Sequence, residues 1–432
     1  MTLRISYSQP DFENKFEQLL MQKREASNDV LEVVREIIAD VRDRGDDAVI
    51  EYTRKFDRLD LTKSGIAVGA EEIDAAFNSI EKSTLEALQL AHDRIYSHHE
   101  RQLPVDDRYT DPIGVELGSR WTAVEAVGLY VPGGTASYPS SVLMNAIPAK
   151  VAGVNRIVMV VPAPDGYIQP LVLAAAKIAG VGEVYRIGGA QAVAALAYGT
   201  QIIAPVVKIV GPGNAYVAEA KRQVFGTVGI DMIAGPSEVL IIADGENDPD
   251  WIAADLMAQA EHDTAAQSIL VTDSARFADQ VEVAVQNQLK TLPRSEIASK
   301  SWEEFGAIIE VDEIADSALL ADRIAAEHLE IMTDDPDALF NKIRNAGAVF
   351  LGRYTPEAIG DYVGGSNHVL PTSRSARFSS GLSVLDYMKR TSILRCGPEQ
   401  LDRIGGAAQI LASVEGLEAH RISVAMRGNR KI

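Results

Sequence analysis

The apolar positions near the start of the chain recur at helical spacing. From residue 29 to about residue 56, charged residues separate apolar ones three or four positions apart, which predicts an amphipathic helix. The apolar positions are Val30, Val33, Val34, Ile37, Ile38 and Val41. A second helical pattern runs from about residue 71 to residue 103 and ends at Pro104, because proline cannot continue the hydrogen-bond ladder. Two helices therefore precede any sheet.

The middle of the chain alternates between short β-rich runs and alanine-rich helical stretches. Between residues 121 and 244 the β-rich runs are 157–161, 184–187, 206–210 and 239–242. Helical stretches at about 169–179, 190–198 and 214–225 separate them, with Gly or Pro turns at the junctions. This alternation predicts a parallel, doubly wound sheet, and ligands of such sheets bind beyond the carboxyl ends of the strands.

The same alternation resumes after residue 244 and predicts a second α/β unit. We expect helices at about 249–262, 274–290 and 313–328 and a strand at 268–272. Residues 259–262 and 325–328 look alike, since each segment ends in Ala-Glu-His, and both chance and internal repetition are compatible with that match. The segment from about 398 to 427 is again helical with a break at Gly416, and residues 360–383 have the Gly-rich and Ser-rich composition of a functional loop.

Composition narrows the possible partners. The formal net charge of −20 argues against nucleic acid, because nucleic-acid-binding proteins cluster Lys and Arg on one face. An acidic surface can attract a cationic substrate, although solubility alone also accounts for such a charge. The single cysteine, Cys396, excludes an intramolecular disulfide and a cysteine-rich metal site, so a metal would need His, carboxylate or amide ligands.

Targeting signals do not appear in the sequence. The N-terminal residues show no basic segment that leads into an apolar stretch, and no uncharged apolar run approaches the roughly 20 residues of a membrane span. We therefore expect a cytoplasmic protein without a membrane partner.

The dinucleotide fingerprint G-x-G-x-x-G is missing from the sequence, so an NAD site would be unorthodox. Three glycine-bearing turns nonetheless follow β-like segments, at 130–134, 188–191 and 211–216. Glycine lets the backbone approach a ligand, and the helix N-termini that follow favour phosphate. Each turn alone has an equally good structural explanation, but three in one domain favour a ligand site.

Several polar residues in the second unit are candidates for chemistry. Gln259 and His262 share one helix face and can reach a common ion, although such a pair is a weak signal alone. Further donors could come from Asp361 and His420, and zinc accepts such nitrogen and oxygen sets. The adjacent Glu327 and His328 suit an acid–base pair, and an ordinary solvated helix end is the alternative.

The remaining histidines are less informative. We expect His92, His98 and His99 to be solvated, because they lie on a long polar helical stretch. His368 lies in the Gly-rich loop, where a loop-shaping role and a site role stay open.

Over nearly the whole chain, from about residue 30 to residue 427, these segments resemble the histidinol dehydrogenase family. Segments that carry the resemblance include GLYVPGGTASYPSSVLMNAIPAKVAGV (128–154), RIGGAQAVAALAYGT (186–200), KIVGPGNAYVAEAKRQV (208–224), QAEHD (259–263), AAEHLEI (325–331), GDYVGGSNHVLPTS (360–373) and EGLEAHRISVAMR (415–427). Chance agreement over that extent is negligible.

The resemblance implies a set of functional residues. It implies zinc ligands at Gln259, His262, Asp361 and His420. It implies substrate contacts at Ser237, Gln259, His262, His328, Asp361, Glu415 and His420, and NAD contacts at Tyr130, Gln191 and Asn214.

The resemblance also implies a reaction and an assembly. L-histidinol is oxidised to L-histidine through an aldehyde by two successive hydride transfers to two NAD molecules, in the last steps of histidine biosynthesis. His328 would accept protons, Glu327 would activate the water that adds to the aldehyde, and zinc would orient the substrate. The family forms homodimers whose C-terminal segments cross over, so we expect Glu415 and His420 to complete the partner's site.

We expect two Rossmann-like α/β domains with a helical N-terminal segment and a helical C-terminal tail. The predicted divisions are a helical segment at 1–28, a first α/β domain at 29–129 plus 238–380 that carries most zinc and catalytic residues, an NAD-binding α/β domain at 130–237, and a tail at 381–432 that reaches the partner.

Three other functions are compatible with parts of the pattern. The first is a related zinc-dependent and NAD-dependent dehydrogenase of another alcohol, such as a sulfonated diol. Glu415 argues for histidinol, because its carboxylate suits a cationic amino alcohol. The second is a zinc hydrolase that uses Glu327 and His328 without a cofactor, and the third is a binding protein without activity.

Overall fold

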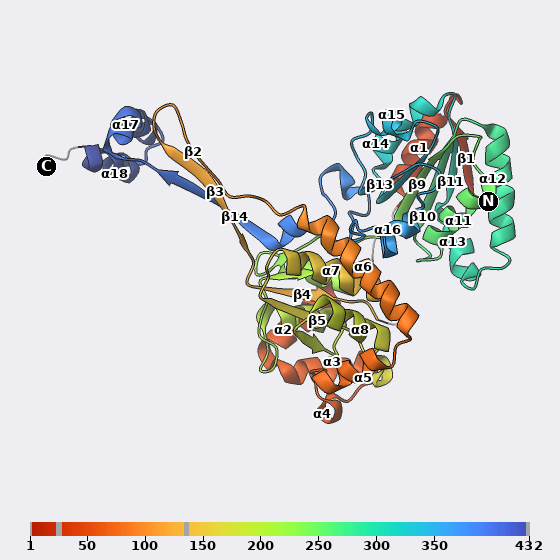
Figure 1. Cartoon of the computed structure of the whole chain (residues 1–432), viewed down its shortest axis with the longest axis horizontal. Coiled ribbons are helices and arrows are strands. Elements are labelled where there is room, and N and C mark those ends of the chain that lie inside the picture. The colour runs from red at the N-terminus through yellow and green to blue at the C-terminus, as the bar shows by residue number, and fades with distance from the viewer. Residues whose placement is uncertain (1, 23–27, 134–137, 429–432) are drawn as a thin grey trace.

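The computed structural model describes residues 2–22, 28–133 and 138–428, and within these residues it contains three β-sheets (Figure 1). Two parallel sheets with their helices form two lobes, which we call the five-stranded lobe and the six-stranded lobe after their sheets. A third, antiparallel sheet forms an arm that extends away from both lobes and ends in two helices (Figure 1). The predicted α/β class with parallel sheets is confirmed.

The five-stranded sheet follows the predicted alternation of strands and helices. Its strands are β4 (Ala126–Tyr130), β5 (Arg156–Val160), β6 (Glu183–Tyr185), β7 (Lys208–Val210) and β8 (Gly229–Ile230), and all are parallel in the order β6-β5-β4-β7-β8. The connecting helices are α7 (Pro139–Val151), α8 (Pro170–Ala179), α9 (Gly189–Tyr198) and α10 (Ala215–Val224). The first strand is central, so the order reverses between β4 and β7, where doubly wound sheets bind ligands.

The helices before the sheet pack on the five-stranded lobe. They are α2 (Asn28–Arg44), α3 (Asp46–Asp57), α4 (Leu61–Ser64), α5 (Ala70–Asn78) and α6 (Lys82–Glu100). The apolar stripe of α2 is buried against α9 and α10, while α5 packs on α8 and α6 on α7. The predicted first domain joined residues 29–129 with residues 238–380. In the structure these helices pack on the five-stranded lobe instead, and the sequence could not show this because an amphipathic pattern does not specify its partner surface.

Both long helical patterns are interrupted. Gly45 separates α2 from α3 and has φ +59°, which side-chain-bearing residues rarely adopt. A Cβ at this position would also lie 2.3 Å from Oε1 of Gln201. The second pattern breaks between α5 and α6.

The six-stranded sheet is also parallel, in the order β1-β11-β10-β9-β12-β13. Its strands are β1 (Leu3–Ser6), β9 (Glu238–Ala243), β10 (Gln267–Thr272), β11 (Ala307–Glu310), β12 (His328–Met332) and β13 (Ala348–Leu351). Its helices are α1 (Phe12–Met21), α11 (Pro249–Ala260), α12 (Ala275–Gln288), α13 (Ser295–Phe305), α14 (Ser317–Ile324), α15 (Pro336–Phe340) and α16 (Glu357–Tyr362). The N-terminal segment, predicted as helical, thus also contributes an edge strand, in which Leu3 pairs with Ala307.

The arm consists of β2 (Asp107–Thr110), β3 (Glu116–Ala123) and β14 (Met388–Arg395), in the order β14-β3-β2. It leads to two tip helices, α17 (Pro398–Val414) and α18 (Glu418–Gly428), which pack on each other (Figure 1). The predicted helical tail and its break at Gly416 are present, but β14 was not expected. Both faces of β14 are largely exposed, so its sequence lacks the alternation that identifies a half-buried strand.

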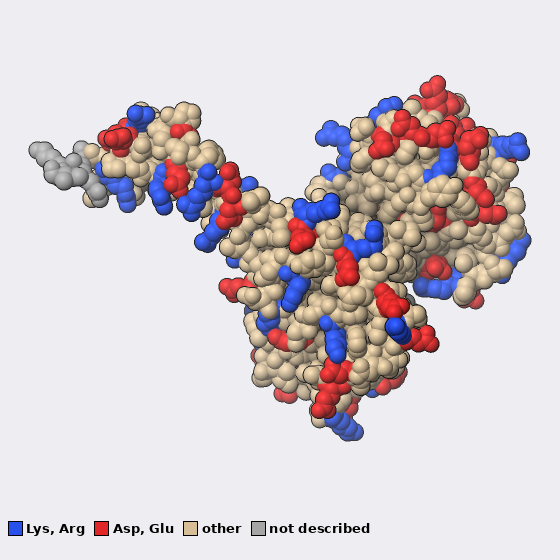
Figure 2. Space-filling view, in the orientation of Figure 1, with Lys and Arg blue, Asp and Glu red and all other residues tan. Residues whose placement is uncertain are grey.

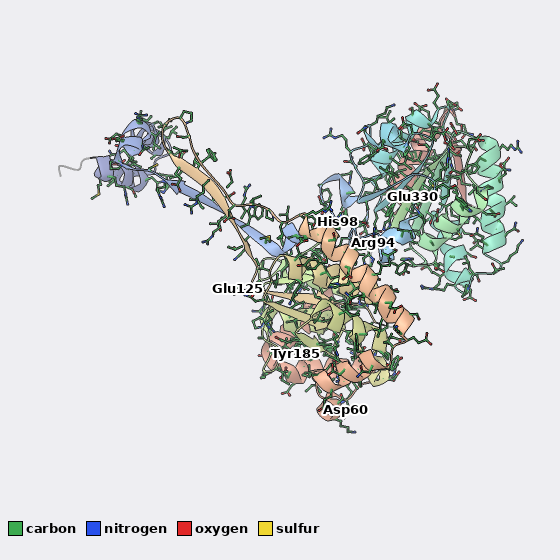
Figure 3. The ribbon with its side chains drawn as sticks, in the orientation of Figure 1. Asp60, Arg94, His98, Glu125, Tyr185 and Glu330 are labelled. Atoms are coloured by element: carbon green, nitrogen blue, oxygen red, sulfur yellow. The ribbon has the colours of Figure 1, made fainter. Side chains whose placement is uncertain are left out.

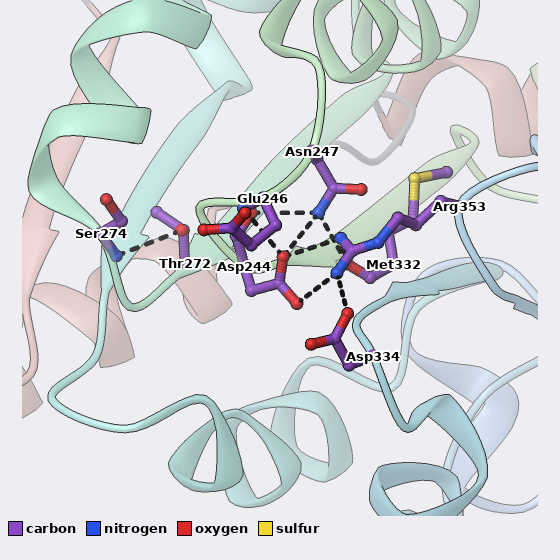
Figure 4. A network of polar contacts seen from close by, with 8 residues as sticks. All are labelled: Asp244, Glu246, Asn247, Thr272, Ser274, Met332, Asp334 and Arg353. Atoms are coloured by element: carbon purple, nitrogen blue, oxygen red, sulfur yellow. Dashed lines mark hydrogen bonds and ion pairs between the residues drawn. The ribbon is translucent and has the colours of Figure 1, made fainter.

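Ion pairs close the carboxyl edge of the six-stranded sheet (Figure 4). Arg353, which follows β13, donates to both carboxylate oxygens of Asp244 at 2.7 and 2.9 Å and to Asp334 at 2.6 Å. Asn247 donates to the backbone oxygens of Asp244 and Met332. The edge that binds ligands in many such sheets is therefore occupied by the protein's own side chains in this lobe.

No helix in the described ranges has both the length and the apolar character needed to cross a membrane.

Candidate active site

The three glycine-bearing turns meet at the carboxyl edge of the five-stranded sheet. The Tyr130 hydroxyl, at the end of β4, accepts a hydrogen bond of 3.0 Å from the Gly189 N–H in the second turn. A Cβ on Gly211, in the third turn, would lie 2.2 Å from the backbone oxygen of Tyr130. The turns that follow β4, β6 and β7 therefore touch one another, and residues 134–137 of the first loop lie outside the described part of the chain.

The side chains at this edge include the three residues for which the resemblance implies NAD contacts. Burial raises the pKa of Tyr130 to about 12, so its hydroxyl keeps its proton at neutral pH and can donate it. Gln191 is buried and its Oε1 has no hydrogen-bond partner among the described residues. Asn214 is exposed and caps α10 by accepting from the N–H groups of Tyr216 and Val217, both at 3.1 Å.

The catalytic candidates lie at the amino edge of the six-stranded sheet, where β12 begins, and not at a carboxyl edge. His328 is the first residue of this strand and is buried. Its Nδ1 lies 3.3 Å from the backbone oxygen of Glu238 and 3.4 Å from Oε2 of Glu357. A carbonyl oxygen can only accept, so it favours the tautomer with the proton on Nδ1 and the lone pair on Nε2. That Nε2 has no hydrogen-bond partner in the described structure.

The pKa values of this pair move in opposite directions. Burial lowers the pKa of His328 to about 4, although the Asp361 carboxylate and the Glu238 carbonyl oppose this shift. Burial raises the pKa of the Glu327 carboxyl well above its usual range, and the charges of Glu238 and Asp361 raise it further. The imidazole is therefore neutral at neutral pH and has a free lone pair, whereas the Glu327 carboxyl holds a proton more tightly than an exposed carboxyl does.

Glu327 lies against the start of β9. The Glu327 Oε2 accepts from the backbone N–H of Glu238 at 3.0 Å, and the Ser237 hydroxyl is near enough to lower the pKa of this carboxyl group. Residues 231–237 connect the end of β8 to the start of β9. A connection of this length spans at most about 25 Å, so the cofactor edge of one sheet lies close to the amino edge of the other.

His262 and Asp361 lie near His328, and Gln259 lies one helical turn before His262, whose N–H donates to the Gln259 backbone oxygen at 3.2 Å. Gln259 is the penultimate residue of α11, and both polar atoms of its amide are buried without a hydrogen-bond partner in the described residues. His262 follows in the next turn, close enough for its charge to lower the pKa of His328. Asp361, on α16, places Oδ1 3.9 Å from Nε2 of His328. Burying an amide without hydrogen-bond partners costs free energy. The Gln259 amide therefore suits a site in which a bound ligand supplies the missing partner.

His368, for which the sequence left a loop-shaping role and a site role open, lies beside Asp361. It is largely buried, and its Nδ1 lies 3.1 Å from the backbone oxygen of Asp361 and 3.8 Å from Oδ1 of that residue. Burial lowers its pKa, partly offset by Asp361. The Gly-rich loop therefore supports α16 and the site at the same time.

The predicted zinc ligands are split between two parts of the molecule. His420 is exposed on the tip helices at the far end of the arm, as is the predicted substrate contact Glu415, whereas Gln259, His262 and Asp361 lie in the six-stranded lobe (Figure 1). In the ranges that the structure describes, no three His, Cys, Asp or Glu side chains are placed to hold a metal ion. One protomer thus offers an amide, an imidazole and a carboxylate, a donor set that zinc accepts but that needs a further ligand.

One prediction about a side chain differs from the structure, and one residue of the site was missed. His99 was expected to be solvated, but it is buried, where its Nδ1 lies 2.7 Å from the Ile95 oxygen and Asn367 approaches its Nε2 at 3.3 Å. Glu357 was not identified at all, although it lies on α16 one helical turn before Asp361. That i,i+4 spacing is the signal that could have revealed it.

Buried acidic groups also lie below the site. Glu330, which Figure 3 labels inside the six-stranded lobe, is on the same face of β12 as His328 and accepts from the N–H of Glu357 at 2.6 Å. Burial raises the pKa of Glu330 well above its usual range.

On the other lobe, Arg94 of α6, also labelled in Figure 3, donates to the backbone oxygens of Val363 and Gly364 and so holds the loop after α16.

Known proteins share the sequence of this chain over nearly its whole length. The family model described as histidinol dehydrogenase matches residues 20–428. A protein named histidinol dehydrogenase from Brucella suis biovar 1 (strain 1330) is 68% identical over 429 residues, which cover 99% of this chain and 100% of the relative. One of the same name from Rhodopseudomonas palustris (strain ATCC BAA-98 / CGA009) is 66% identical over 431 residues and the full length of both chains.

A solved structure supports the same conclusion at the level of the fold. The crystal structure of histidinol dehydrogenase from Elizabethkingia anophelis superposes with a TM-score of 0.94 at 35% sequence identity, covering 99% of this chain and 98% of that chain. Family model, sequence and fold agree over nearly the whole length, and the chain belongs to the histidinol dehydrogenase family.

Proposed function

We propose that this protein oxidises L-histidinol to L-histidine with two molecules of NAD, as the last steps of histidine biosynthesis. The observation that carries the proposal is the buried imidazole of His328: its Nε2 has no partner in the described structure, and its Nδ1 lies 4.0 Å from Oε2 of Glu327. The names of relatives that are 66–68% identical support histidinol over another alcohol.

The residues of this chain divide the chemistry between them. In the first oxidation the alcohol carbon gives a hydride to NAD, and its hydroxyl gives a proton to Nε2 of His328. In the second, Glu327 takes a proton from the water that adds to the aldehyde carbonyl, and the hydrate gives a hydride to a second NAD. In total, one alcohol, one water and two NAD⁺ give one carboxylate, two NADH and three protons; His328 and Glu327 take the first two protons, and the third leaves the hydrate hydroxyl as the carboxylate forms. Because His328 and Glu327 are buried, the aldehyde is protected from side reactions between the steps.

The dinucleotide binds, in this proposal, at the carboxyl edge of the five-stranded sheet. Tyr130, Gln191 and Asn214 line this edge at the point where the strand order reverses. The unpartnered Oε1 of Gln191 offers an acceptor, and the N-terminus of α10 favours a phosphate. The short connection from β8 to β9 keeps this edge close to His328.

Gln259, His262 and Asp361, with His420 of a second protomer, would hold zinc. When bound, zinc would hold and orient the imidazole and amino groups of the substrate. The unpartnered amide of Gln259 is the feature of this chain that fits such a ligand. Ser237 and His328 would contact the substrate from the same lobe, and Glu415 would offer its carboxylate to the cationic amino group.

The same proposal includes a homodimer with shared active sites in the cytoplasm. The arm is a thin ribbon whose tip exposes apolar side chains, with Val414 82% and Met426 72% exposed. Such surfaces require a partner to be stable. The ribbon carries Lys and Arg side chains interspersed with Asp and Glu (Figure 2), so that it offers both donors and acceptors to the surface of another copy.

The deciding experiment measures NADH formed per L-histidinol consumed, with and without a chelator. Two NADH per substrate, lost on chelation and restored by zinc, are expected. Turnover of a sulfonated diol but not of histidinol would favour the related dehydrogenase instead, and zinc-dependent hydrolysis without NAD would favour the hydrolase.

A further inference from the structure

A buried ion pair lies directly beneath the cofactor edge. Lys221, on α10, contacts Asp231, which follows β8, and the two side chains are 2% and 1% exposed. Burying two charges costs several kcal/mol for each ion, and an apolar pair of similar volume is often as stable. Stability alone therefore does not account for this pair, and the groups that it contacts are informative.

The ion pair holds both polar atoms of Gly211. The Lys221 Nζ donates to the Gly211 oxygen at 2.9 Å, and the Gly211 N–H donates to Oδ2 of Asp231 at 2.7 Å. The other carboxylate oxygen of Asp231 accepts from the N–H of Met232 at 2.6 Å. The backbone of this turn is thus fixed from two sides by buried charges.

The backbone of Gly211 has an unusual conformation and is tightly packed, so it needs such support. Its φ is +107°, which side-chain-bearing residues rarely adopt, and it lies against the backbone of Tyr130. Lys221 is seven residues after Asn214 on the same helix, so two helical turns separate the capped N-terminus from the lysine. The pair therefore ties the turn, the N-terminus of α10 and the end of β4 into one rigid unit.

Asp231 also begins the connection that ends at Ser237, next to Glu327. One end of this connection is fixed to the cofactor turn, and the other end contacts the catalytic carboxyl. A change at Asp231 can therefore affect the distance between the two halves of the site.

We propose that Lys221 and Asp231 are positioning residues for the dinucleotide: they hold the Gly211–Asn214 turn in the shape that receives it. This inference rests on the proposed NAD site at that edge. Neither residue needs to touch the cofactor, because each acts through the backbone of Gly211.

The test uses the full-length protein with both charges removed together, as Lys221→Gln with Asp231→Asn. Removing one charge alone would leave the other buried and unpaired, which destabilises any fold. We expect a folded variant with a similar melting temperature, an NAD KM raised about 10-fold, and a histidinol KM that changes less than about twofold. NADH binding, measured by fluorescence titration without substrate, should weaken by the same factor as the NAD KM.

The matched control is the ion pair at the other edge of the same sheet. Arg156 begins β5 and donates to both carboxylate oxygens of Glu183, at 2.7 and 2.9 Å, at the start of β6. Arg156→Met with Glu183→Gln should leave NADH affinity unchanged. A folded Lys221/Asp231 variant that binds NADH as the wild type does would overturn the proposal, and so would an equal loss of affinity for both ligands.

A second variant covers the case in which the neutral pair does not fold. Lys221→Arg keeps the charge beside Asp231, but its planar guanidinium cannot place a donor at the Gly211 oxygen in the same way. It should weaken NADH binding several-fold, and unchanged binding would contradict the inference. Failure of wild-type protein to reduce NAD with histidinol would instead count against the proposed function, since NADH titration tests the positioning role without substrate.

Discussion

The Nε2 atom of His328 lies 3.9 Å from Oδ1 of Asp361, although the two residues are on different elements, β12 and α16. This contact brings the proposed base next to a proposed zinc ligand. Substrate held through Asp361 would therefore present its hydroxyl to Nε2, and the two residues should fail in different ways when they are replaced.

His328→Asn should block the first oxidation. Removing a positioned general base lowers kcat by about 10²–10⁴-fold, and the amide cannot accept the hydroxyl proton. Stopped-flow measurement of the first NADH, with histidinol affinity measured in parallel, checks this expectation. A variant that forms the first NADH at the wild-type rate would remove His328 from this role.

Glu327→Gln should spare the first oxidation and stall the second. The glutamine keeps the acceptor for the Glu238 N–H but cannot take a proton from water. We expect one NADH per histidinol and an aldehyde that can be trapped with a carbonyl reagent. Equal loss of both steps would contradict the division between Glu327 and His328.

Removing zinc should weaken histidinol binding much more than NADH binding. The proposed ligands Gln259, His262 and Asp361 lie in the six-stranded lobe, whereas the dinucleotide edge belongs to the five-stranded lobe. Calorimetric titration of both ligands before and after chelation measures this difference. An unchanged histidinol affinity after chelation would contradict the proposed role of the metal in orienting the substrate.

Two inactive variants should restore activity when they are mixed. His420→Asn removes a residue of the arm and Asp361→Asn a residue of the lobe, so a hybrid dimer has one intact site if arms cross over. Random exchange of subunits makes half of the dimers hybrid and should recover about a quarter of wild-type activity. Mixing Asp361→Asn with His328→Asn is the control, because both changes lie in the lobe and no intact site forms. No recovery in the first mixture would place His420 outside the shared site.

Gly211→Ala should destabilise the protein and weaken NADH binding. The new Cβ would lie 2.2 Å from the Tyr130 oxygen at a φ of +107°, which together cost about 2–4 kcal/mol. Gly226→Ala is the matched control, since φ is +99° there but nothing lies within 4 Å of the added Cβ. That variant should lose only about 1–2 kcal/mol and bind NADH normally. Urea unfolding and NADH titration distinguish the two.

Acid should destabilise the fold through His99. Burial lowers the pKa of this imidazole to about 4, below its ordinary value of 6.5, with a further contribution from His98, while the Ile95 carbonyl opposes the shift. The unfolded chain therefore binds a proton that the folded chain does not, and stability falls as pH decreases from about 6.5 towards 4. Between pH 7 and pH 5 the loss should be about 2 kcal/mol. His99→Gln should remove this part of the slope in urea unfolding, and an unchanged slope would exclude His99 as its origin.

Local patterns determined most of the secondary structure. Helical spacing identified α2, and the strands β5, β6, β7, β9 and β10 and their helices follow the predicted alternation closely, because each such element has an apolar face with its own period. The resemblance carried by long segments such as 128–154 identified the family before any geometry was known. Glycine placement likewise marked the turns that meet around Tyr130.

Tertiary structure decided which surfaces meet. Periodicity shows that the stripe of α2 is buried but not that it packs on α9 and α10, and nothing local to His99 shows that Asn367 covers it. The groups around His328 come from β9, the turn after α11 and α16, which are up to about 120 residues apart, so only packing reveals Glu357 as a neighbour and leaves Nε2 without a partner among the described residues. The arm places His420 far from the other proposed ligands of the same chain. The spacing of residues along the sequence could not reveal this separation, because the fold alone decides which distant residues meet.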